Sequence, residues 1–205
     1  LKKWGYTSIR IGASDTICQY VLPKTMLEFT REQPKCEVSI SPGDTSALLS
    51  QIDEGKLDLA IGLETPSLHA DFRFTPFVSD ELCFITSPDH PWVNSPPKTA
   101  EELSKTRFIT YGNETATSAV LNQFLNEHGI KQRAPLTMGN MESIKEMTKI
   151  GLGVGIISPW VASHDLTNNL LVKHNISPSP TRTWGYYTRR SKTLSLPEEK
   201  FIACC

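Results

Sequence analysis

The sequence of 205 residues lacks any apolar run near the roughly 18 residues that a membrane span requires. It also lacks an excess of charge of either sign, because its formal net charge is -1 at pH 7. Such a chain has no field that would draw it to DNA or to an anionic membrane. We therefore expect no membrane partner, and we expect any contact with DNA to depend on a part of the protein outside these residues.

Cysteine is scarce and irregularly spaced. The cysteines are odd in number and form no CxxC or Cys/His metal pattern: Cys18, Cys36, Cys83, Cys204 and Cys205. Reduced thiols in a cytosolic protein fit this usage, and the first residues, LKKWGYTS, hold no apolar export segment. Cys18 stands near an expected helix start, where the pKa of a thiol can fall, although a buried, inert thiol is favoured. We expect a cytoplasmic protein without a metal.

Signatures of catalysis and nucleotide binding are also missing. The histidines are scattered without an HExxH pattern, and neither a Walker loop nor a GxSxG elbow occurs. Gly151, Gly153 and Gly155 follow an expected helix and lead into a strand. A dinucleotide-binding loop has the opposite order, because it follows a strand and opens a helix. The sequence therefore predicts a protein that is not an enzyme and holds no cofactor.

What the sequence does contain is an alternation of strand-like and helix-like segments. Residues 9–63 read as strand, hydroxyl-rich turn, helix, strand, helix and strand. Pro23 should open or kink the first helix. Thr45 can cap the second helix, and Gly55 suits the left-handed residue at its end. Strands 9–12, 37–40 and 57–63 would then form two right-handed βαβ units of a parallel sheet.

A second lobe should repeat this plan. A strand at 81–86 is expected to cross into it, and a strand at 183–188 is expected to return. Between them we expect strands at 107–111, 134–138 and 154–158, with helices at 118–128 and 141–150. The predicted fold class is α/β, with two Rossmann-like lobes joined by two crossover strands. Lobe I would hold residues 1–84 and 187–205, and lobe II residues 85–186.

Ligands of open α/β sheets bind beyond the carboxyl ends of the strands. That rule selects three polar junctions, at 14–16, 112–117 and 140–142. Each places a hydroxyl or amide side chain where a strand passes into a helix. The exposed backbone N–H groups and the helix dipole favour an anionic or polar group there.

Several motifs occur in a fixed order along the chain. GAS, Thr16 and Leu22-Pro23 come first, then a strand at 37–40, GKLDLAIG at 55–62 and IKEMTKIGLGVGIISP at 144–159. Over nearly its whole length the chain resembles the effector-binding domain of LysR-type transcriptional regulators. The resemblance implies a type 2 periplasmic-binding-protein-like fold and an effector held between the lobes. It also implies an N-terminal winged helix-turn-helix domain absent from this fragment, and assembly into homodimers or homotetramers.

In that family, hydroxyls and backbone amides at helix starts hold the effector. The resemblance carries this role to Ser14, Thr16, Thr115 and Thr117, with Met141 and Gly62 as walls. The whole set of expected effector contacts is Ser14, Asp15, Thr16, Gly62, Gly112, Asn113, Thr115, Thr117 and Met141.

Simpler roles compete with these assignments. Ser14, Thr115 and Thr117 could serve purely as helix caps. Asp15 either caps its helix, which is the favoured role, or selects a ligand with an amino or hydroxyl group. Arg10, Arg73 and Arg107 are candidate cationic partners or ordinary surface residues.

The predicted function is therefore ligand sensing by a transcriptional regulator, with a small polar or carboxylate-bearing effector. The alternative is the solute-binding protein of a transporter, which shares the two-lobed fold. A third class is a two-lobed enzyme similar to prephenate dehydratase. The sequence leaves the effector, the promoters and the direction of regulation open.

Overall fold

The computed structural model describes residues 6–65, 68–112 and 115–205. The chain forms two compact units, each with its own five-stranded sheet. Unit 1 contains residues 1–78 and 183–205, and unit 2 contains residues 79–182. The predicted lobe boundaries, after residue 84 and before residue 187, lie further along the chain. Both dividing points fall inside long strands, β4 (Phe72–Glu81) and β10 (Thr181–Arg189).

The sheet of unit 1 has the order β2-β1-β3-β10-β4. Strands β1, β2 and β3 are parallel, and β10 runs antiparallel to β3. The three parallel strands are β1 (Thr7–Ala13), β2 (Cys36–Pro42) and β3 (Leu59–Leu63). The helices are α1 (Asp15–Tyr20), α2 (Leu22–Glu32), α3 (Thr45–Asp53) and α8 (Leu196–Ala203). The α/β class predicted from the sequence is confirmed.

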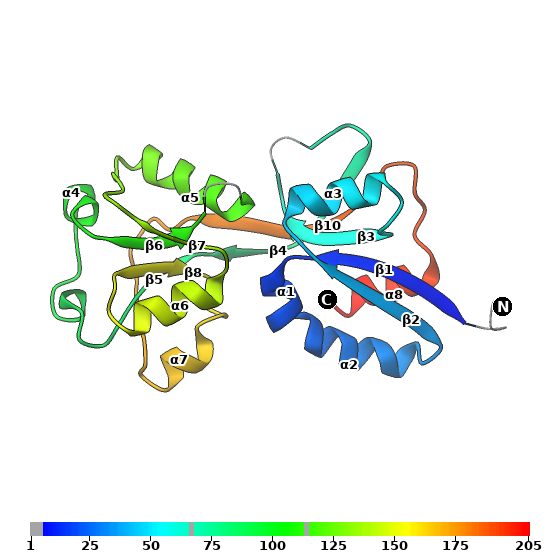
Figure 1. The fold of residues 1–205 in the computed structure, drawn as a ribbon, viewed down its shortest axis with the longest axis horizontal. Helices are drawn as coiled ribbons and strands as arrows, with labels where there is room; N and C mark the ends of the chain where they lie inside the picture. The colour runs from blue at the N-terminus through cyan, green and yellow to red at the C-terminus, as the bar shows by residue number, and fades with distance from the viewer. Residues whose placement is uncertain (1–5, 66–67, 113–114) are drawn as a thin grey trace. The chain divides into compact units, whose positions relative to one another are not determined.

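Helix α3 covers one face of this sheet, and α2 and α8 cover the other (Figure 1). Leu48 and Ile52 of α3 pack in a buried cluster with Ala60 of β3 and Tyr187 of β10. Strand β3 is buried at all five positions. The alternation of leucine with small residues in this segment therefore marks a strand covered on both faces.

Chain breakers in unit 1 act largely as predicted. The first helical segment restarts at Leu22, so Pro23 falls in the first turn of α2, where proline is tolerated. Gly55 follows α3 with a φ of +69°. The cap predicted at Thr45 is wrong, because Asp44 accepts a hydrogen bond from the N–H of Ala47 at 2.8 Å.

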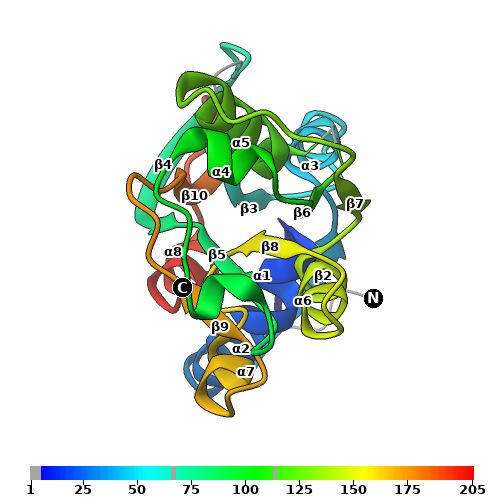
Figure 2. The ribbon, with the colours of Figure 1, turned by 90° about the vertical axis from the view of Figure 1, so that its left-hand side faces the viewer.

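The sheet of unit 2 has the order β7-β6-β8-β5-β9 (Figure 2). Strand β6 is parallel to β7 and β8, whereas β5 is antiparallel to β8 and β9. The strands are β5 (Cys83–Thr86), β6 (Phe108–Tyr111), β7 (Leu136–Met138), β8 (Val154–Ile157) and β9 (Val172–His174). The helices are α4 (Ala100–Ser104), α5 (Ala116–Glu127), α6 (Met141–Lys149) and α7 (Ser163–Thr167), with a short 3-10 turn at Pro91–Val93.

Glycines at the end of α6 and within β8 have backbone and packing roles. Gly151 ends α6 with a φ of +79°. A Cβ on Gly155 would lie 2.4 Å from the Oγ1 of Thr148 and 3.2 Å from the Cγ2 of Ile144, both on α6. Glycine therefore lets α6 approach β8 closely. Within the described parts of the chain, no helix is both long enough and apolar enough to cross a membrane.

Candidate functional site

The junction after β1 lies at the carboxyl end of the parallel strands of unit 1. Ser14 caps α1, its Oγ accepting a hydrogen bond from the N–H of Ile17 at 3.4 Å. Ala13 pairs with Ile61 of β3, so Ser14 and Gly62 are the next residues on adjacent strands. The structure therefore brings Ser14 and Gly62 to the same edge of the sheet.

The polar residues that follow have different surroundings. Asp15 is exposed and is the first residue of α1. The predicted capping role of Asp15 is therefore wrong, because Ser14 holds the capping position. A carboxylate in the first turn still interacts favourably with the helix dipole. Thr16 is buried at 9% exposure.

Gly62 has a packing role in addition to its place at the sheet edge. A Cβ at this position would lie 3.0 Å from the Oγ1 of Thr45 and 3.5 Å from the ring of Tyr187. A larger residue would therefore press on the start of α3. The absence of a side chain at Gly62 therefore lets the start of α3 pack closely against β3.

The matching junctions of unit 2 lie at the ends of β6 and β7. Tyr111 pairs with Met138, and the N–H of Gly112 donates to the carbonyl of Met138 at 3.1 Å. The described junction residues, 112, 115–117 and 140–142, therefore share one edge of the sheet. Met141, buried at 1% exposure, is the first residue of α6. Asn113, also a predicted contact, lies outside the described residues.

Capping accounts for one of the two threonines at the start of α5. Thr115 forms a capping box with Ser118, with hydrogen bonds of 3.1 Å in both directions. Thr117 is no cap. It is buried at 6% exposure, and its Oγ1 accepts a hydrogen bond of 3.0 Å from Nη1 of Arg182.

Arg182 is a buried cation that sequence reasoning missed. It is 2% exposed and forms a two-pronged ion pair with Asp80. Its Nε donates to Oδ1 of Asp80 at 3.0 Å, and its Nη2 donates to Oδ2 at 2.6 Å. Ser158 and Trp160 donate to the same carboxylate at 2.7 and 3.0 Å.

These partners decide the charge of Asp80. Burial alone would raise the pKa of its carboxyl. The hydrogen bonds and charge of Arg182, with the donors of Ser158 and Trp160, outweigh burial and hold that pKa below its usual value. Asp80 is therefore ionised at neutral pH, and unit 2 contains a complete buried ion pair.

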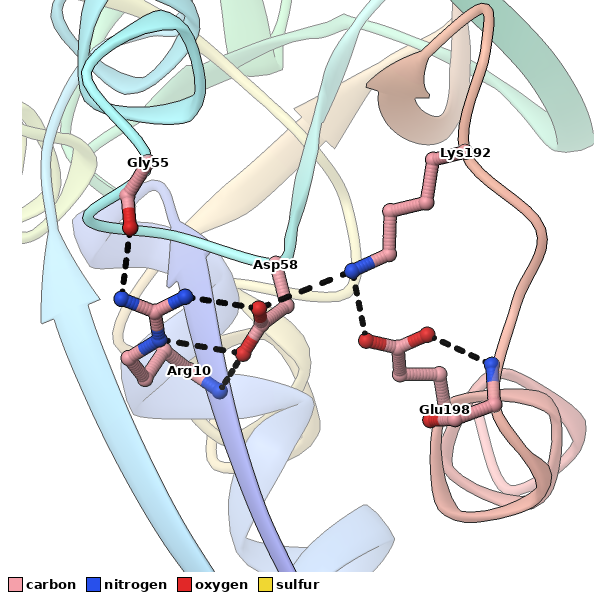
Figure 3. Close-up of polar contacts among 6 residues, drawn as sticks. Arg10, Gly55, Asp58, Lys192 and Glu198 are labelled. Carbon is pink, nitrogen blue, oxygen red and sulfur yellow. Dashed lines mark hydrogen bonds and ion pairs between the residues drawn. The ribbon is translucent and has the colours of Figure 1, made fainter.

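The arginines that the sequence suggested as ligand partners are placed differently. Arg73 and Arg107 are exposed. Arg10 holds Asp58, the aspartate of the GKLDLAIG motif, with Nη2 2.8 Å from its Oδ1, and donates through Nη1 to the carbonyl of Gly55 at 2.6 Å (Figure 3). Arg10 therefore links β1 to the turn that follows α3.

Lys192 extends this cluster towards the C-terminal helix. Its Nζ lies 3.5 Å from Oδ1 of Asp58 and 2.8 Å from Oε1 of Glu198 (Figure 3). Burial acts to raise the pKa of Asp58, but the bonds from Arg10 and the charge of Lys192 prevail and lower it. The motif aspartate thus joins the first and last segments of unit 1.

Replacing Asp58 with alanine should lower the free energy of unfolding by about 1–2 kcal/mol, since several charged donors lose their acceptor. The matched control is Glu54→Ala, which removes an exposed ion pair with Lys56 and should cost less than about 1 kcal/mol. Urea denaturation of both variants measures the difference. Equal losses would show that Asp58 is an ordinary surface charge.

Burial makes two of the thiols less acidic than a free cysteine. Burial, with the charge of Asp15, raises the pKa of Cys18, and burial raises that of Cys83 to about 11. The lowered pKa considered for Cys18 is therefore wrong. Among the residues that the structure describes, no three His, Cys, Asp or Glu side chains form a group suited to a metal ion.

Comparison with known proteins gives a consistent result. The family model described as the LysR substrate binding domain matches residues 7–205. A probable RuBisCO transcriptional regulator of Cyanidium caldarium is 31% identical over 93% of this chain and 62% of that protein. The uncharacterized HTH-type transcriptional regulator YeiE of Escherichia coli K12 is 26% identical over 97% and 67%. The chain thus spans about half to two thirds of the curated relatives it matches.

Solved structures share the fold. The cofactor-binding domain of the Cbl transcriptional regulator matches with a TM-score of 0.88 at 18% identity, over 100% of this chain and 90% of that one. The regulatory domain of CcmR from Synechocystis PCC6803, in complex with 2-PG, matches with 0.85 at 23%, over 96% and 94%. The effector-binding domain of QuiR with shikimate matches with 0.84 at 16%, over 98% and 95%. The chain therefore has the type 2 periplasmic-binding-protein-like fold predicted from the sequence.

Proposed function

The chain belongs to the LysR substrate-binding-domain family, and from this we propose that it is the ligand-sensing part of a transcriptional regulator. The relatives named above are described as transcriptional regulators and not as transport proteins, which favours regulation over the transporter alternative. The longer relatives have room for a further domain. We propose that such a domain, an N-terminal winged helix-turn-helix, makes the contact with DNA.

One observation carries the proposed binding function. In both units, hydroxyl side chains stand where parallel strands end and helices begin: Ser14 and Thr16 after β1, Thr115 and Thr117 after β6. Ligands of α/β sheets bind at such ends. The proposed effector contacts are these residues with Asp15, Gly62, Gly112, Asn113 and Met141.

The proposed effector is a small polar molecule that bears a carboxylate or a similar acidic group. Helix starts favour such groups through their N–H groups and dipoles. Two solved structures of the same fold are complexes with shikimate and with 2-PG, which supports an effector with an acidic group. Asp15, exposed beside Ser14, favours a ligand that also carries a hydroxyl or amino group.

Regulation would follow from a shift between conformations. An effector changes such an equilibrium only by its difference in affinity for the two states. We propose that the protein works in this way as a homodimer or homotetramer in the cytoplasm, without catalysis of its own. Turnover of a bound ligand would contradict this assignment and favour the enzyme alternative.

A thermal-shift screen tests the proposed function. The panel contains shikimate, phosphoglycolate, small aromatic and aliphatic carboxylates, amino acids, and neutral sugars. A true effector at about 100 times its dissociation constant should add roughly 2.7 kcal/mol of stability. A panel without any stabilising compound would argue against ligand sensing.

A further inference from the structure

Arg182 lies at the boundary of unit 2 along the chain. It is the last residue of that unit before the chain passes into unit 1, and Asp80 lies close to the other passage. The two residues belong to β10 and β4, the strands that run through both boundaries. Their ion pair therefore links β4 to β10 within unit 2, next to the two points where the chain crosses a unit boundary.

The same guanidinium contacts the proposed effector site through Thr117. Arginine has five N–H donors and no acceptor. In the 3.0 Å contact, therefore, Nη1 of Arg182 must donate and Oγ1 of Thr117 must accept. The hydroxyl proton of Thr117 is then directed away from Arg182.

A hydroxyl that accepts a hydrogen bond from a cation becomes a stronger donor, because hydrogen bonds in a chain polarise one another. Thr117 is also the second residue of α5, where the helix dipole is positive. Both effects favour a ligand oxygen that accepts the Thr117 proton. An ammonium group at the same place would be disfavoured by the positive end of α5 and by the nearby charge of Arg182.

We propose that Arg182 is a positioning residue that makes Thr117 a hydrogen-bond donor, so that the ligand group at Thr117 is an acidic oxygen acceptor. This inference rests on the proposed function and assigns a role to a residue in it. Asp80 holds the guanidinium from the opposite side through Nε and Nη2. Arg182 acts through Thr117 and not by direct contact with the ligand.

The test compares acids with matched compounds in which an amine or an amide replaces the acidic group. The probes are 4-hydroxybenzoate with 4-hydroxybenzylamine, phosphoglycolate with ethanolamine, and shikimate with shikimic amide, each titrated by calorimetry. The wild-type chain should prefer the acid. Thr117→Val and Arg182→Met should each reduce that preference about tenfold to a hundredfold, as expected for the loss of a hydrogen bond to a charged group.

Two further variants distinguish a role of Arg182 in positioning Thr117 from a general destabilisation of unit 2. Thr117→Ser keeps the hydroxyl and should retain the preference for acids. Trp160→Phe removes a different donor to Asp80, so it should weaken the network and leave the preference unchanged. A purely structural Arg182 would instead reduce the affinity for both members of each pair alike.

The outcomes are distinct. Binding of amines or amides as tight as that of acids would overturn the inference while the sensing function stands. If Thr117→Val keeps the full preference for acids, the inference is also overturned, and the sensing function again stands. If no compound of either kind binds, and the wider screen also finds none, the proposed function itself fails.

Discussion

Arg182→Met should lower the free energy of unfolding by about 3–5 kcal/mol, because it leaves the carboxylate of Asp80 buried without its counter-charge. The side chain of Arg182 is 1% exposed and that of Asp80 is 12% exposed, so water cannot replace the lost partner well. Urea denaturation followed by circular dichroism measures the loss.

The matched control lies on the same strand. Arg189 forms an ion pair with Asp53, but the two side chains are 40% and 62% exposed. Arg189→Met should therefore cost no more than about 1 kcal/mol. If the two arginine variants lose equal stability, the buried network around Asp80 does not hold unit 2 together as described.

Phe201→Ala should also cost about 3–5 kcal/mol, because it removes a large side chain from a closed core. Phe201 is fully buried on α8 and meets the ring of Phe29 edge-on, with centroids 5.4 Å apart. The contact joins the C-terminal helix to α2, from the first part of the chain. Thermal and urea unfolding both report this loss.

Leu196 on the same helix provides the control. It is 61% exposed, so Leu196→Ala should change the stability by less than about 0.5 kcal/mol. A loss for Phe201→Ala as small as this would mean that α8 is not an integral part of unit 1.

Local patterns in the sequence predicted much of the fold. The strands around Ile9 and Ile61 and the helix carrying Phe29 were predicted because their burial follows from short-range periodicity. Gly55 was assigned to a helix end, and its φ is +69°. Backbone chemistry of this kind depends on the residue itself and its close neighbours.

Strand β4 and the ends of helices were harder to predict. Sequence reasoning expected a single crossing strand at 81–86, but the chain forms β4 and then β5. Strand β4 is an edge strand that contains Pro76 and is largely exposed, and a proline within a run argues against a strand. The errors at Asp15 and Thr45 have another cause. Adjacent polar residues can all cap a helix, and the extended backbone at Ser14 and Asp44 decides which one does.

No local sequence pattern indicated that Arg182 is a buried cation of unit 2. Arg182 contacts Asp80, Thr117 and Ser158, which are far from it in sequence. An arginine among polar neighbours is usually a surface residue. Its role therefore follows from the tertiary fold, whereas the hydroxyls at the strand ends could be predicted from their place after a strand.

Isothermal titration calorimetry with the compound that most stabilises the chain tests the sensing role most directly. We predict saturable binding to the wild-type chain and to Thr99→Ala, which removes the cap of α4 outside the proposed site. The combined variant Ser14→Ala, Thr16→Ala and Thr117→Ala should bind at least about a hundredfold more weakly, since each lost hydrogen bond to a charged group is worth about 1.5–3 kcal/mol. Equal affinity of the combined variant and the wild type would contradict the account.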